Sequence, residues 1–137
     1  MMCLAARRMI AKQSGVIMTV SALPSRMGSP LIGGYSPALA AKDALTRSLS
    51  IELAPHGIRV LSVRPHAIPE TDSIKDVFNL KAAKVMTWDA WQEALASRTH
   101  TRRLTTLAEL AHVAAFMASD KASGITGTTV NLTMSDD

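Results

Sequence analysis

The sequence predicts a doubly wound α/β fold with about three parallel strands and flanking helices. The first strand is expected at 16–20, an apolar run rich in β-branched residues and without polar alternation, which indicates burial on both faces. Two further strands are expected at 58–63 and 129–133, with helix-patterned segments between the strands. Such alternation is typical of a parallel sheet covered by helices. The 137 residues, 47% of them hydrophobic, suit one domain over 1–137.

An amphipathic helix is predicted at 1–12, ahead of the first strand. Basic residues in its last turns suit the helix dipole, because cations are favoured near a helix C-terminus. No start signal precedes this helix, as though the earlier part of a longer element were absent. Its apolar face, at helical spacing, comprises Met2, Ala5, Ala6, Met9 and Ile10.

A connection rich in proline, serine and glycine spans 23–34 and leads into a second helix. Irregular connections of this length inside a compact domain are more often functional than accidental. Ser36 is expected to cap the helix and Pro37 to open it, because proline is tolerated at the first helical position. The helix over 36–54 and the strand at 58–63 then complete a right-handed strand–helix–strand unit.

One or two short helices are predicted between 70 and 103, followed by a capped helix. Trp88 and Trp91 are interpreted as packing residues rather than as a binding box, because aromatic side chains are so often buried. Thr106 and Glu109 have the spacing of a capping box, in which each side chain bonds the backbone N–H of the other residue. We therefore expect a helix to start just after Thr106.

The composition excludes several classes of function. The net charge is +4, but the basic residues are scattered and only 4% of residues are aromatic, so no nucleic-acid groove is expected. The longest uncharged stretch, 27–41, is interrupted by glycines and prolines, which excludes a membrane-spanning helix. Cys3 is the single cysteine, and no histidine or carboxylate has metal-ligand spacing. The sequence therefore predicts a cytoplasmic protein with no metal, nucleic-acid or membrane partner.

The stretch from 15 to 71 carries the residues of a known family. A strand ending in VSA, a loop to a tyrosine, a helix ending in SLSIELAPHGIRV and a strand ending in proline follow one another in this order. Together they resemble the second half of a short-chain dehydrogenase/reductase, and the similarity extends more weakly over nearly the whole chain. The resemblance implies a partial Rossmann-like fold. The stretch is GVIMTVSALPSRMGSPLIGGYSPALAAKDALTRSLSIELAPHGIRVLSVRPHAIPET.

The resemblance implies oxidoreductase chemistry carried by a serine, a tyrosine and a lysine four residues after the tyrosine. In this sequence the tyrosine is Tyr35, the catalytic candidate, whereas Ala22 occupies the serine position and Leu39 the lysine position. A free tyrosine titrates near 10 and a neighbouring ammonium favours its charged form, so Leu39 removes the activating charge. Lys42 lies seven residues from Tyr35, about 10 Å along the helix, too far to replace that contact. Ser21 is a poor substitute for the serine, since neighbours on a strand point to opposite faces.

The cofactor implied by the resemblance is NAD or NADP. The family region that contacts it corresponds here to Pro65, His66, Ile68 and Thr71. The family has Pro-Gly where this sequence has Pro65 and His66, and a histidine side chain there either moves aside or fills the space beside the nicotinamide. Thr71 stands one residue later than the family's threonine, which weakens the expected cofactor contact.

The family's N-terminal dinucleotide-binding half, with its Gly-rich loop, has no counterpart in these residues. We therefore expect 1–137 to be a truncated, C-terminal portion of the fold that binds no NAD or NADP and has no turnover alone. Two alternatives stay open: a non-catalytic interaction module that docks on an intact family subunit through the helices at 1–12 and 36–54, and an enzyme active by other means. The expected partner is such a subunit or a second copy in a homo-oligomer, because the strand at 16–20 leaves an exposed sheet edge.

Overall fold

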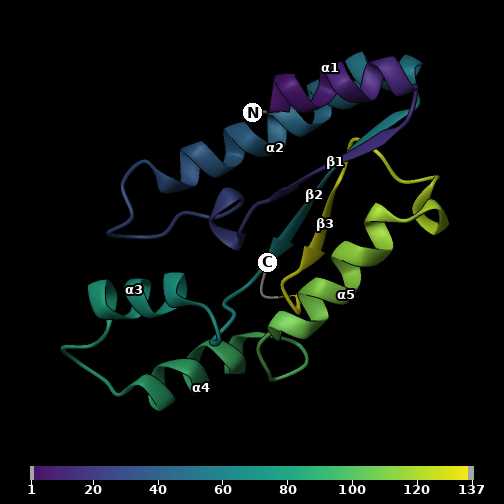
Figure 1. The fold of residues 1–137 in the computed structure, drawn as a ribbon. Helices are drawn as coiled ribbons and strands as arrows, with labels where there is room; N and C mark the ends of the chain where they lie inside the picture. Colours follow the sequence, from purple (N-terminus) through teal and green to yellow (C-terminus); the bar gives the residue numbers. More distant parts are fainter. Residues whose placement is uncertain (1, 136–137) are drawn as a thin grey trace.

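The protein contains one three-stranded parallel sheet in the computed structural model, which describes residues 2–135 (Figure 1). The strand order is β1-β2-β3, and both neighbouring pairs are parallel. The prediction of three parallel strands in an α/β fold is confirmed, because each strand lies at its expected place in the chain. The strands are β1 (Gly15–Val20), β2 (Ile58–Pro65) and β3 (Thr129–Leu132).

Helices cover both faces of the sheet (Figure 1). α1 (Met2–Lys12) and α2 (Tyr35–Leu53) lie on one side, and α5 (Leu107–Ala118) lies on the other. Side chains of the buried central strand β2 alternate between two apolar cores, as the strand period of two requires. Within residues 2–135 no helix combines the length and apolar character needed to cross a membrane. The buried members of the two cores are Ile17, Leu53, Ile58 and Val60 on one face, and Leu61, Val63 and Met117 on the other.

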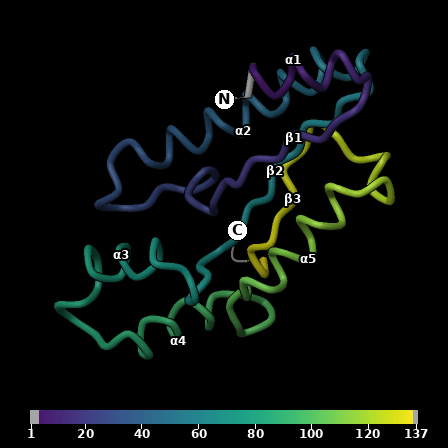
Figure 2. Tube along the Cα trace, in the orientation of Figure 1, coloured from purple at the N-terminus to yellow at the C-terminus, as the bar shows by residue number. Residues whose placement is uncertain are grey.

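Two further helices, α3 (Asp72–Lys81) and α4 (Trp88–Arg98), lie beyond the carboxyl end of β2 (Figure 2). The prediction of short helices between 70 and 103 is confirmed. An aromatic cluster joins the two helices, with the Phe78 ring centroid 5.2 Å from Trp88 and 5.4 Å from Trp91. The interpretation of both tryptophans as packing residues is confirmed to this extent.

The start of α2 corrects one prediction. The helix begins at Tyr35, and its N-cap is Gly34 rather than Ser36, with no side-chain capping bond. Ala38 N already donates to Gly34 O, so the first helical turn forms before Ser36 is reached. Ser36 therefore lies inside the helix, and its buried hydroxyl has no hydrogen-bond partner within the described part of the chain.

The burial predicted for β1 is also wrong. Only Ile17 of this strand is buried, and the Val20 side chain is 52% exposed. β1 is the edge strand of the sheet, so its side chains are covered less completely than those of the central strand β2. An apolar run without polar alternation therefore does not distinguish an edge strand from a central one here.

The N-terminus of α5 confirms the predicted capping box. Thr106 Oγ1 accepts a hydrogen bond from Glu109 N, and Glu109 Oε2 accepts one from Thr106 N at 2.9 Å. The Glu109 carboxylate also forms an ion pair with Arg103, with 2.7 Å between Oε1 and Nη2. Hydrogen bonds from Arg103 and from the Thr106 backbone lower the pKa of Glu109 to about 2. The first turn of α5 is therefore stabilised by an ionised carboxylate at neutral pH.

Candidate functional site

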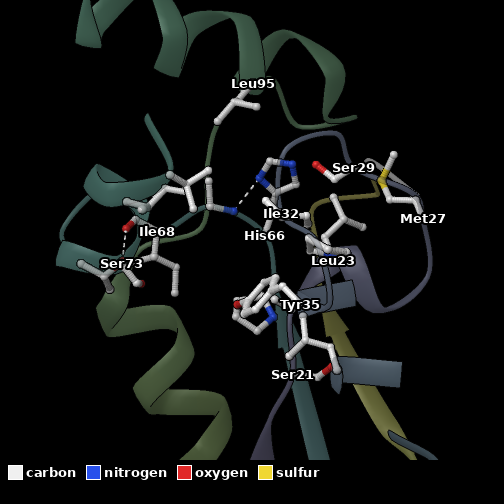
Figure 3. Close-up of a pocket in the computed structure, with 18 of the residues that line it drawn as sticks. Ser21, Leu23, Met27, Ser29, Ile32, Tyr35, His66, Ile68, Ser73 and Leu95 are labelled. Carbon is white, nitrogen blue, oxygen red and sulfur yellow. Dashed lines mark hydrogen bonds between the residues drawn. The ribbon is translucent and has the colours of Figure 1, made fainter. Parts of the chain in front are cut away.

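A cavity of about 590 Å³ opens where β1 and β2 end (Figure 3). Its walls come from the ends of these strands, the 23–34 connection, the start of α2 and the pair α3–α4. Ligands of open α/β sheets bind outside the carboxyl ends of the strands, because the loops that follow the strands meet there. This cavity is therefore the candidate active site.

Tyr35, Ala22 and Leu39 all line this cavity, so the structure brings the three sequence-predicted positions together. Tyr35 opens α2 and is 49% exposed, with its ring at the lower end of the cavity in Figure 3. Leu39 lies one turn further along α2 and is buried as an apolar wall. Neither Ala22 nor Leu39 presents a group that can exchange a proton with Tyr35. The catalytic role of Tyr35 stays a prediction.

Lys42 reaches the cavity, which the sequence argument from helix distance does not anticipate. Residues seven apart lie on the same face of a helix, and the long lysine side chain covers much of the 10 Å between them. Its ammonium donates a hydrogen bond to Val20 O at 2.9 Å. Lys42 therefore lines the site, and its hydrogen bond to the end of β1 fixes the position of its ammonium.

Ser21 lies beside Tyr35 at the lower end of the cavity (Figure 3). Its hydroxyl is buried and makes no hydrogen bond of good geometry with the residues described. It does lie close enough to Asp43 to favour the ionised form of that carboxyl. Ser21 therefore belongs to the polar group beneath the site more than to its open surface.

The four residues expected to contact a cofactor also line the cavity: Pro65, His66, Ile68 and Thr71. The His66 ring stays beside the cavity, where its Nδ1 accepts a hydrogen bond from Ala67 N at 2.6 Å. Thr71 Oγ1 donates to Ile68 O at 2.8 Å and is thereby turned toward its own loop. Their role toward a cofactor stays a prediction.

A buried ion pair beneath the site escapes the sequence argument. Arg64 Nη2 of β2 lies 2.5 Å from Asp43 Oδ2 of α2, and both side chains are buried. Arg64 also donates to Asn131 Oδ1 at 2.7 Å and to Ser25 Oγ at 2.8 Å. An arginine near the end of a strand whose other residues are mostly apolar was the available signal, because such a charge needs a partner when it is buried.

The pKa of Asp43 reflects this arrangement. Burial alone would raise the pKa of the carboxyl, but Arg64 and the nearby hydroxyls of Ser25 and Ser21 outweigh burial and lower the pKa below the ordinary 3.8. Asp43 is therefore ionised at neutral pH. The pair ties α2, β2, β3 and the 23–34 connection together directly under the cavity.

Lys81 is a further residue that sequence reasoning missed. It ends α3, lines the cavity and donates to Ser29 Oγ of the 23–34 connection. Burial lowers the pKa of the Lys81 ammonium.

Trp91 of α4 also lines the cavity, so its interpretation as a packing residue is incomplete. In residues 2–135 no three histidine, cysteine or carboxylate groups come together to hold a metal ion.

Comparisons with known proteins give one consistent family. Residues 1–133 match the family model described as enoyl-(acyl carrier protein) reductase. The chain is 30% identical over 124 residues to (+)-borneol dehydrogenase 2 of Salvia officinalis, covering 90% of this chain and 44% of that protein. It is 31% identical to the 3-oxoacyl-[acyl-carrier-protein] reductase FabG of Rickettsia conorii, covering 93% of this chain and 48% of that protein. The chain thus spans about half the length of these curated relatives.

Solved structures agree with these relatives. Sorbitol-6-phosphate 2-dehydrogenase SrlD from Erwinia amylovora superimposes with a TM-score of 0.87 at 26% identity, over 96% of this chain and 52% of that one. A gluconate 5-dehydrogenase from Burkholderia cenocepacia, in complex with NADP and tartrate, gives a TM-score of 0.78 at 28% identity, over 94% of this chain and 47% of that one. From the family match and the shared fold we conclude that the chain belongs to the short-chain dehydrogenase/reductase family.

Proposed function

We propose that these 137 residues form the substrate side of a short-chain oxidoreductase that uses NAD or NADP to interconvert alcohols and ketones. We further propose that they do not turn over by themselves. The observation that carries both statements is the cavity wall, where Tyr35 stands with Ala22 and Leu39 at the family's serine and lysine positions. At these two positions the chain supplies neither the hydroxyl nor the ammonium of the family pattern, so neither position gives the phenol a group to receive or supply its proton.

The cofactor region supports the same proposal. The Thr71 hydroxyl is engaged by its own loop, and the His66 ring occupies the position where the family has a glycine. No Gly-rich phosphate loop follows any strand of these residues. These residues fit the rim of a nicotinamide site but not a complete dinucleotide site, so we derive no chemical step through the cofactor. We assign the dinucleotide-binding half of the domain to residues outside 1–137. We also propose a cytoplasmic location, because a single cysteine fits a reducing compartment.

The test is a titration of the 137-residue chain with NADH and with NADPH, in which binding is measured by fluorescence and by calorimetry. We expect no saturable binding in the micromolar range, with the gluconate 5-dehydrogenase of Burkholderia cenocepacia, whose structure contains NADP, as the positive control. The double variant Ala22→Ser with Leu39→Lys should restore no carbonyl-dependent NADH consumption, because the restored side chains have no bound cofactor beside them. Saturable binding of either dinucleotide, or turnover by the double variant above the parent chain, would contradict the proposal.

A second candidate function is favoured by the exposed apolar side chains on α1 and α2. Leu4 is 67% exposed and Ile51 is 77% exposed, and these helices are the ones expected to pair subunits. The chain would then act as an interaction module that docks on an intact family subunit or on a second copy. Co-purification with an intact FabG subunit that is lost in Leu4→Glu and Ile51→Glu variants would favour this function.

A further inference from the structure

The cavity is basic as well as apolar. Lys42 and Lys81 line it, and none of the lining residues that the structure describes is an aspartate or glutamate. Lys42 donates to the Val20 carbonyl and Lys81 to the Ser29 hydroxyl, and both acceptors are neutral oxygens. Within residues 2–135, therefore, no carboxylate neutralises either ammonium. Arg98 and His66 also line the cavity and have contacts of their own.

Lys81 is the ammonium group on the α3 side of the cavity. It stands at the end of α3 with its side chain half-buried against the cavity, and that burial lowers its pKa. A partly desolvated cation loses hydration that one hydroxyl replaces only in part. An anion placed at the same point would restore the lost interaction, because hydrogen bonds between ionised groups are about twice as strong as neutral ones.

Apolar side chains lie between Ser29, which accepts the Lys81 hydrogen bond, and Tyr35. Ser29, which anchors Lys81, lies near the upper end in Figure 3, whereas Tyr35 lies at the lower end. Leu23 and Ile32 are drawn between these ends, and Leu95 lies above them. The cavity thus offers an apolar passage with a cation at the end remote from Tyr35.

We propose that the cavity binds a compound that joins an apolar body to a carboxylate, with the carboxylate on Lys81 Nζ and the apolar body extending toward Tyr35. As a substrate this is an oxo or hydroxy acid whose reacting carbon is remote from its carboxylate. That reading as a substrate rests on the proposed function. The binding of the carboxylate does not, because it requires neither a cofactor nor turnover.

The test compares octanoate with octanamide, which has the same length without the charge. Binding is followed through the fluorescence of Trp91, which lines the cavity, in a Trp88→Phe background that removes the other tryptophan. We expect octanoate to bind about tenfold more tightly than octanamide, the size expected of a hydrogen bond to a charged group. Lys81→Gln should abolish this preference and Lys81→Arg should keep it. Lys84→Gln is the matched control, because Lys84 is exposed, outside the cavity lining, and carries the same charge.

Several results would overturn the proposal. Equal affinity for octanoate and octanamide would do so, as would a preference that survives Lys81→Gln or is lost equally in Lys84→Gln. A preference that disappears in Lys42→Gln but not in Lys81→Gln would move the anion to the other lysine and contradict the assignment. Inorganic phosphate competing as well as octanoate would indicate a simple anion site, of the kind that a dinucleotide phosphate occupies. None of these readouts depends on NADH binding, so they are independent of the test of the proposed function.

Discussion

Asp43 and Arg64 form the most constrained polar contact beneath the cavity. The carboxylate and the guanidinium are 2.5 Å apart and almost fully removed from solvent. A buried pair of this kind is often no more stabilising than an apolar pair of the same volume, because desolvation offsets the attraction. Removing one partner is different, since it leaves the other charge buried and alone.

We predict that Arg64→Met lowers the free energy of unfolding by about 3–5 kcal/mol. The double variant Asp43→Leu with Arg64→Met should recover most of this loss, because no buried charge is left unpaired. Urea unfolding followed by circular dichroism measures both values. Lys75→Met, which removes an exposed i,i+3 pair with Asp72, is the control and should cost less than about 0.5 kcal/mol. A full-size loss that persists in the double variant would show that Arg64 acts through packing instead.

The pH dependence of this pair follows from the direction of the Asp43 shift. The pKa of the carboxyl is lower in the folded chain than its ordinary value of 3.8, so ionised Asp43 stabilises the fold. That contribution is present above the unfolded pKa and is lost as the pH falls through the folded pKa. The parent chain should therefore lose stability below about pH 4.

At the level of the helix, the capping box of α5 carries a second titratable contribution. We predict that Glu109→Gln lowers the melting temperature at pH 7, because the amide cannot pair with the charge of Arg103. Since the pKa of Glu109 is lowered to about 2, the ionised carboxylate stabilises the fold above the ordinary pKa of 4.5. The difference between parent and variant should shrink as the pH falls from 4.5 toward 2.

Glu93→Gln on the exposed face of α4 is the matched control and should change the melting temperature little at any pH. A Glu109→Gln effect that is the same at pH 3 and pH 7 would contradict the assigned role of the charge. Thr106→Ala should cost about 1 kcal/mol at pH 7, since it removes the side chain that accepts the hydrogen bond from Glu109 N.

The capping box was predictable because its two residues are three apart and depend only on local backbone geometry. The start of α2 was not, although Ser36 and Pro37 form an equally local signal. There a turn in which Tyr35 N donates to Ile32 O leads directly into the helix, and Gly34 supplies the first acceptor. A local signal therefore located the helix correctly but not its first residue.

Across the whole molecule, the edge of β1 is the feature with the largest consequence. No strand of the described residues pairs with its outer side, and Val20 at its end is largely exposed. Ser21 N donates to Val63 O of β2, so strand alternation turns the Val20 carbonyl outward, where Lys42 covers it. One backbone group of the edge is thus protected, while the rest stays open to another chain.

We predict that the chain self-associates at low micromolar concentration through this edge. Val20→Lys should shift sedimentation toward the 14.6 kDa monomer, because a charge on an edge strand opposes pairing with a second strand. Ile51→Lys is the matched control on the exposed face of α2. Dissociation by Ile51→Lys and not by Val20→Lys would show that the helices form the interface. A monomeric parent chain would show that the β1 edge does not drive self-association.

The strands at 16–20 and 58–63 and the residues around Tyr35 were accessible from the sequence, because the family motif spans one continuous stretch. The contacts that complete the cavity were not accessible. Lys81 meets Ser29 across 52 residues of chain, and Asp43 meets Arg64 across 21, so neither pairing leaves a local pattern. Such contacts are set by how α3 and α2 pack around the 23–34 connection.

The sparse packing of α3 and α4 has a thermodynamic consequence. Neither helix contains a buried residue, and neither packs extensively on the sheet; they are joined chiefly by the ring cluster of Phe78, Trp88 and Trp91. Separating them from the sheet therefore exposes little apolar area and costs much less free energy than unfolding the β2 core. A ligand that binds the cavity only when these helices are in place stabilises the ordered segment by its own binding free energy. The fraction of chains with an occupied cavity and the fraction with ordered α3 and α4 therefore rise together.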